Sequence, residues 1–162
     1  MSTRLTSVNG QLDRALVGNI SLTGGVGNGN QWLKSTEHIY VDGTVTQGQV
    51  LPKNTRGLCA VALENNMVLF LGGYNGTFRS GTWWYDINTK QFSDGPQMKY
   101  KRAGLACTVF KSDRHAGRSV VLAAGGRGYS SDSSKTYEVL DYTVKQKQWE
   151  TSKEAHICLY LP

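Results

Sequence analysis

The chain has 162 residues, of which 39% are hydrophobic and 19% charged, and this composition fits one globular domain and excludes a disordered chain. The formal net charge is +6, but the Lys and Arg residues are spread along the sequence. A nucleic-acid-binding domain would concentrate them on one face or helix, so we expect no nucleic-acid partner. The 19 glycines beside only three prolines are typical of many short strands joined by tight turns.

The sequence contains no recognisable targeting signal or membrane span. No apolar run approaches the length of a membrane span, and residues 1–5 lack the hydrophobic region of a secretory signal. We therefore expect no membrane partner and a cytoplasmic location, or secretion if the chain is part of a longer protein that carries a signal. The glycosylation sequons at Asn19 and Asn75 would matter only in that second case.

The three cysteines, Cys59, Cys107 and Cys158, are an odd number and a poor disulfide framework. Cys59 and Cys107 lie in similar apolar contexts, so we expect two buried thiols that act as small hydrophobic side chains. No metal-ligand spacing of Cys and His is present in the sequence, which disfavours a zinc site.

An internal repeat begins with three apolar runs that each end in two glycines. The runs cover residues 19–25, 68–73 and 120–126. From Gly25 to Gly73 is 48 residues, and from Gly73 to Gly126 is 53 residues. Such runs predict strands buried on both faces, where the glycine pair lets the backbone leave the strand. The pairs are Gly24-Gly25, Gly72-Gly73 and Gly125-Gly126.

A second apolar run follows each glycine pair, at residues 36–41, 82–87 and 136–142. In the later two repeats a tyrosine, Tyr85 or Tyr142, precedes another aromatic residue, Phe92 or Trp149, by seven positions. This spacing predicts one aromatic side chain on each of two adjacent strands, filling the gap to the neighbouring sheet. The recurring Asp86 and Asp141 are expected to cap the turn after the strand rather than to act in acid–base catalysis.

Another strand is predicted before each of the last two glycine pairs, at residues 58–63 and 105–110. Each is introduced by an arginine, Arg56 or Arg102. Residues 3–8 are a weak counterpart in the first repeat. With no helical apolar period present, we expect almost no helix and an all-β chain of about three four-stranded antiparallel blades, in approximate repeats 1–52, 53–98 and 99–162.

These apolar runs, glycine pairs and Tyr–aromatic spacings resemble the kelch family, over roughly residues 19–149. The resemblance implies a kelch-type β-propeller, usually of about six blades. Three repeats cannot close a ring of the roughly 4–8 blades that propellers use. We therefore expect a partial propeller, which is a piece of a longer protein, a truncated gene product, or a half-ring completed by self-association with a second copy.

The favoured function is a protein–protein interaction scaffold. The loops after the glycine pairs should cluster at one end of the blades, and they carry residue types that are enriched at interface hot spots. The alternative for each residue is an ordinary solvated turn with its ring folded back onto the blade. The candidate partner-binding residues are Trp32, Tyr74, Phe78, Arg79, Arg127 and Tyr129. The resemblance implies the substrate-binding part of a ubiquitin-ligase adaptor, or an actin-binding protein.

Two other functions remain open. A galactose-oxidase-like copper oxidoreductase has a similar propeller, but its copper needs two His and two Tyr ligands. The histidines His38, His115 and His156 lie in unrelated phases of the repeat and have no ligand spacing. We therefore expect no metal, no cofactor and no enzymatic activity. The third function is a structural half-ring that assembles without a ligand.

Overall fold

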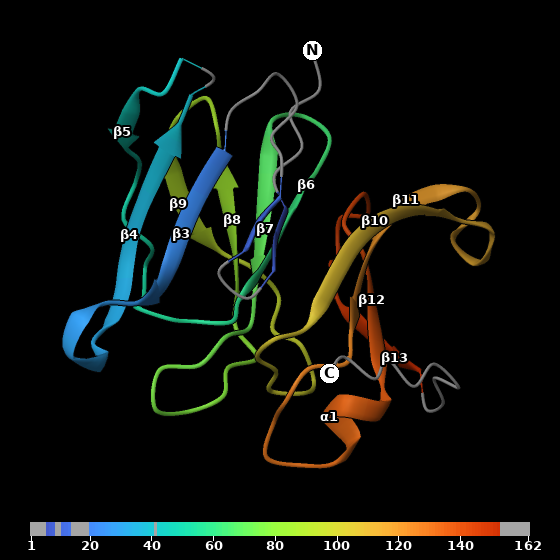
Figure 1. Ribbon diagram of the computed structural model, residues 1–162. Helices are drawn as coiled ribbons and strands as arrows, with labels where there is room; N and C mark the ends of the chain where they lie inside the picture. The colour runs from blue at the N-terminus through green and yellow to red at the C-terminus, as the bar shows by residue number, and fades with distance from the viewer. Residues whose placement is uncertain (1–5, 9–10, 14–19, 41, 153–162) are drawn as a thin grey trace.

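The computed structural model describes residues 6–8, 11–13, 20–40 and 42–152 (Figure 1). Asn19, His156, Cys158 and the first residues of the predicted strand 3–8 lie outside these ranges. In the described part, helical structure consists of α1 (Asp132–Lys135) and two 3-10 turns, η1 (Asn28–Asn30) and η2 (Asp113–His115), and no helix there is long and apolar enough to cross a membrane. The strands are β1 (Thr6–Val8), β2 (Gln11–Asp13), β3 (Ile20–Val26), β4 (Trp32–Ile39), β5 (Val45–Gln47), β6 (Cys59–Ala62), β7 (Met67–Leu71), β8 (Thr82–Asp86), β9 (Gln91–Asp94), β10 (Ala106–Ser112), β11 (Arg118–Ala124), β12 (Tyr137–Asp141) and β13 (Trp149–Ser152).

The strands form three antiparallel sheets, ordered β3-β4-β5, β2-β1-β6-β7-β8-β9 and β10-β11-β12-β13. We call β3–β5, β6–β9 and β10–β13 the first, second and third blades. Figure 1 shows them side by side, with the second blade between the other two. This arrangement confirms the predicted all-β partial propeller.

The first repeat departs from the predicted four strands. Strand β1 does not join the first blade but pairs with β6 of the second, with Thr6 opposite Val61 and Ser7 opposite Ala60. Among the described residues the first blade therefore has three strands. The inner strand β6 offers an unpaired backbone edge, and the β1–β2 hairpin covers it.

The hydrophobic core lies on both faces of the second blade. Strand β7 is buried on both sides, as its apolar run predicts, and Val68, Leu69 and Leu71 have no exposed surface. Strand β11 is similar, whereas β3 is only half-buried because polar residues interrupt its run. One cluster joins the second and third blades, and it contains Cys59, Val61, Leu69, Leu71, Met98, Leu105, Val121, Ala123 and Leu140.

The paired aromatics lie close to the predicted places: Tyr85, Phe92 and Trp149 are on strands, and Tyr142 directly follows β12. Tyr85 on β8 is opposite Phe92 on β9, with ring centroids 4.7 Å apart, and both pack on the core face that contains Leu51 and Phe70. Tyr142 and Trp149 pack against the cluster between the second and third blades. The indole N–H of Trp149 donates a hydrogen bond to the Pro96 carbonyl at 2.8 Å, which ties the outer strand to the linker from the second blade.

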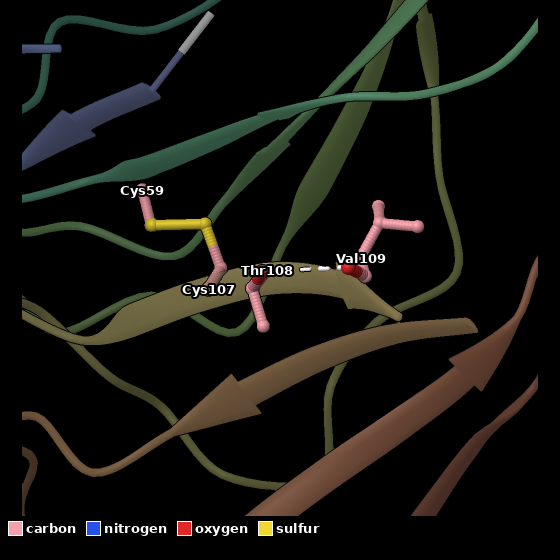
Figure 2. The surroundings of a disulfide bond; sticks show 4 residues. All are labelled: Cys59, Cys107, Thr108 and Val109. Atoms are coloured by element: carbon pink, nitrogen blue, oxygen red, sulfur yellow. Dashed lines mark hydrogen bonds between the residues drawn. A yellow bond between two sulfur atoms is a disulfide. The ribbon is translucent and has the colours of Figure 1, made fainter. Parts of the chain in front are cut away.

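The expectation of two free thiols at Cys59 and Cys107 is wrong. The structure joins them in a disulfide between β6 and β10, with Cα atoms 6.1 Å apart (Figure 2). The two residues occupy corresponding inner strands of adjacent blades, and the stacking of repeats brings these strands together. The result is a covalent link between the second and third blades.

The glycine pairs turn the chain out of each blade, and the first two pairs also bond to the segment that leads into the next blade. All six glycines have positive φ, between 64° and 111°. The N–H of Gly25 donates to the Thr55 carbonyl at 2.9 Å, and the N–H of Gly73 donates to the Arg102 carbonyl at 2.7 Å. A Cβ at Gly24 or Gly72 would collide with those same carbonyl oxygens. Glycine is therefore required by both the backbone conformation and the close approach of the next blade.

Candidate functional site

The connections that follow the glycine pairs lie at one end of the blades. They cover residues 27–31, 72–81 and 125–136, and Figure 1 shows all three along the lower edge of the molecule. The structure therefore brings together loops that are about 50 residues apart in the sequence.

Four of the candidate side chains form a continuous row of ring contacts, which we call the aromatic ridge: Trp32, Tyr74, Phe78 and Tyr129. The ring centroids are 5.9 Å apart for Trp32 and Tyr74, 5.0 Å for Tyr74 and Phe78, and 5.1 Å for Phe78 and Tyr129. The first, second and third blades each contribute at least one ring. Tyr129 is 66% exposed and the other three are half-buried, so the ridge protrudes most at its third-blade end.

The backbone positions the ridge. Tyr74 exchanges two backbone hydrogen bonds with Arg56, of 2.9 and 3.0 Å, and it also forms a β-bridge with Phe78. The indole of Trp32 lies against Gly76, where a Cβ would stand 3.2 Å from the ring. The loop of the second blade is therefore fixed at its base and packed against the first blade.

Cationic side chains flank the ridge. The Arg56 guanidinium lies 5.3 Å from the Tyr74 ring centroid, and the Lys101 ammonium lies 5.8 Å from that of Tyr129, both within cation–π range. Arg79 is used inside its loop, where it donates two hydrogen bonds to the Asn75 side-chain oxygen at 2.6 and 2.9 Å. Arg127 is exposed. Sequence reasoning missed Arg56 and Lys101 because they precede inner strands rather than follow a glycine pair.

The two arginines that introduce inner strands have different roles. Arg56 is exposed, whereas Arg102 is fully buried with Glu138, 3.1 Å away. Glu138 also accepts hydrogen bonds from the backbone N–H groups of Lys99 and Tyr100, and Arg102 donates to the carbonyls of the third blade. Burial lowers the pKa of Arg102, while the charge of Glu138 acts to raise it. This network anchors the segment before β10, which carries Lys101, to the third blade.

The two described histidines each bond to a serine of their own blade. His38 Nδ1 lies 2.8 Å from Ser21 Oγ, and burial followed by the charge of Lys90 lowers the pKa of His38. His115 is buried, with Nδ1 2.9 Å from Ser112 Oγ and Nε2 3.4 Å from Glu150. That Ser–His–Glu composition is typical of hydrolases, but the serine and histidine are both buried in one tight turn, which they hold closed. These contacts favour a structural role.

The recurring aspartates cap turns, as predicted. Asp86 accepts from the backbone N–H groups of Asn88 and Thr89, and Asp141 accepts from the N–H and hydroxyl of Thr143. Burial acts to raise the pKa of Asp141, but the hydrogen bonds from Thr143 and Arg118 outweigh it and lower that pKa to about 2.

The comparisons with known proteins concern the fold. No protein-family model and no curated protein matches the sequence. Among solved structures, the chain is similar to one titled "Structure of YjhT", with a TM-score of 0.63 and 12% sequence identity. The match covers 96% of this chain and 54% of that one, so the chain spans about half the length of this structural neighbour. Together with the three antiparallel blades, the likeness shows a β-propeller-like all-β fold, which is a scaffold used for interaction or for catalysis.

Proposed function

We propose that this chain is a protein-binding scaffold built from kelch repeats, and that it holds its partner through the connections after the glycine pairs. The aromatic ridge carries the proposal, because four rings from three blades form one surface at the loop end of the fold. Trp, Tyr and Arg are the residue types most enriched at interface hot spots. The partner is another protein, and the module itself catalyses no reaction.

The kelch assignment is supported by features that recur between blades. The glycine pairs share one backbone conformation in three blades, and the Tyr–aromatic pairs of the later two pack against the core. A substrate-binding role in a ubiquitin-ligase adaptor, or an actin-binding role, would use the same ridge.

The disulfide between Cys59 and Cys107 supports a proposal about the compartment. Disulfides persist in oxidising environments and are rare in the cytosol. We therefore propose an oxidising compartment rather than the cytoplasmic location that the sequence led us to expect.

Site-specific photo-crosslinking tests the binding role. A benzophenone amino acid replaces Tyr129 in the ridge or, as a matched control, the exposed Phe110 on β10, which lies toward the other end of its blade. We expect light-dependent adducts with a small set of proteins from position 129 only, and weaker adducts when Phe78→Ala is added. Identical adducts from both positions, or none from position 129 in cells that express the protein, would contradict the proposal.

A further inference from the structure

The charges of the connections differ sharply between the two ends of the blades. At the ridge end, five connections cover residues 27–31, 48–58, 72–81, 95–105 and 125–136. They contain eight Lys and Arg residues and a single acidic one, Asp132; the basic ones are Lys53, Arg56, Arg79, Lys99, Lys101, Arg102, Arg127 and Lys135. At the opposite end, residues 40–44, 63–66, 87–90, 113–117 and 142–148 contain four basic and three acidic residues. Eight of the 18 Lys and Arg residues, which look dispersed along the sequence, thus lie in connections at the ridge end.

Most of these cations are available to a ligand. Arg102 is neutralised by the buried Glu138, and Arg79 is committed to Asn75. The other six are exposed: Lys53, Arg56, Lys99, Lys101, Arg127 and Lys135. On the acidic side, the exposed Asp94 ends strand β9 directly before the connection 95–105. The connections at the ridge end therefore carry an excess of exposed positive charge, and two of the cations, Arg56 and Lys101, lie against rings of the ridge.

We infer that the ridge binds an acidic segment of the partner protein, one that places an aromatic or aliphatic side chain between its carboxylates. This inference rests on the proposed function and names the chemistry of its partner. Carboxylates would pair with Lys101 and Arg127, which lie beside Tyr129 or in its loop, while the apolar side chain would contact the exposed Tyr129 ring.

A single-stranded nucleic acid is also a polyanion, but the ridge is poorly built for it. Base stacking needs open ring faces along the surface. Here the rings meet edge-on or tilted, with interplanar angles of 89°, 60° and 86°, and cations lie over the faces of Tyr74 and Tyr129. This geometry offers no continuous row of open ring faces for successive bases, whereas the exposed part of Tyr129 can still contact a single apolar side chain of a peptide.

The test measures the affinity of the full chain for a fluorescein-labelled glutamate–tyrosine copolymer by fluorescence anisotropy. Polyglutamate and oligothymidylate serve as comparison probes. The variant Lys101→Glu/Arg127→Glu reverses two charges at the ridge. The matched control Lys145→Glu/Lys147→Glu makes the same change in net charge at the opposite end. Circular dichroism confirms that both variants fold.

We expect the ridge variant to weaken copolymer binding by about tenfold or more, and the control by less than about twofold. Tyr129→Ala should weaken binding of the copolymer more than it weakens binding of polyglutamate. Equal losses in the two charge variants would overturn the inference, because they would show general attraction of a polyanion. Tighter binding of oligothymidylate than of the copolymer would also overturn it and would identify a nucleic-acid surface.

The two proposals can fail separately. If the photo-crosslinked adducts at position 129 persist in the Lys101→Glu/Arg127→Glu background, the ridge binds a protein that is not acidic, and only the present inference falls. If no adduct forms at position 129 at all, the proposed function itself falls.

Discussion

Removal of the inter-blade disulfide should destabilise the protein strongly. Cys59 and Cys107 close a loop with a sequence separation of 48 residues. A cross-link that closes a loop of that length lowers the entropy of the unfolded chain, and this stabilises the folded protein by about 4 kcal/mol. That is a large share of the roughly 5–15 kcal/mol by which domains are stable. For a chain of this size, it corresponds to a fall in melting temperature of about 8–16 °C.

The assay compares thermal unfolding of Cys158→Ala, which keeps the cross-link, with Cys59→Ala/Cys107→Ala/Cys158→Ala, which lacks it. Reduction with a phosphine should lower the melting temperature of the first protein and leave that of the second unchanged. Thiol titration in denaturant should find no free thiol in oxidised Cys158→Ala and two after reduction. Melting temperatures within about 2 °C of each other, or two free thiols before reduction, would refute the reasoning.

Four further predictions follow from other contacts. Glu138→Gln removes the charge that pairs with a fully buried arginine, so urea unfolding should show a loss of about 3–5 kcal/mol; a loss below 1 kcal/mol would contradict the role of the network. Because the pKa of Asp141 is lowered to about 2, its carboxylate contributes stability above about pH 4 that is lost as the pH falls through 2; the stability gap between the protein and Asp141→Asn should shrink over that range, and a constant gap would contradict it. Gly72→Ala should cost more than Gly117→Ala, since both have positive φ but only a Cβ at Gly72 would strike a neighbouring carbonyl, and equal melting temperatures would show that the neighbour yields. Light scattering should find a β-rich dimer or larger species rather than a cooperatively melting monomer, because in the described part of the chain the first and third blades have no further blade on their outer sides.

Much of the architecture was predictable from repetition. The spacing of the glycine pairs gave the length of the repeat. Each pair has positive φ and bends the chain out of its strand, as predicted. The first blade was harder, since β3 carries Ser21 and Thr23 inside its run and its expected inner strand pairs elsewhere. Strand β1 pairs with the edge of β6 because that edge is unpaired in the folded blade, and the local sequence of β1 does not reveal which edge is unpaired.

The disulfide was missed although a signal was present. Cys59 and Cys107 both lie near the start of the strand that precedes a glycine pair, in adjacent repeats, and both of these strands were predicted from the sequence. The odd number of cysteines argued against a disulfide, whereas a comparison of the two predicted strands would have suggested that Cys59 and Cys107 pair. The burial of Arg102 had no such signal, because Arg56 precedes a similar strand and remains exposed.

For the candidate site, the sequence identified the rings but not their order. Trp32, Tyr74, Phe78 and Tyr129 come from three blades, and their succession depends on the spacing between blades. Arg56 and Lys101 lie in the connections that lead from one blade into the next. These connections come beside the loops after the glycine pairs only when the blades stack, so the sequence alone did not reveal the contacts of Arg56 and Lys101 with the ridge.

The hydrogen bonds of the glycine pairs have a consequence for engineering. They use main-chain atoms alone, so they do not depend on which side chain follows each pair. The three residues at that position are Val26, Tyr74 and Arg127, which share neither size nor charge. A library randomised at these positions and at position 129 should retain the fold, so the ridge can serve as a paratope that is diversified to recognise new targets.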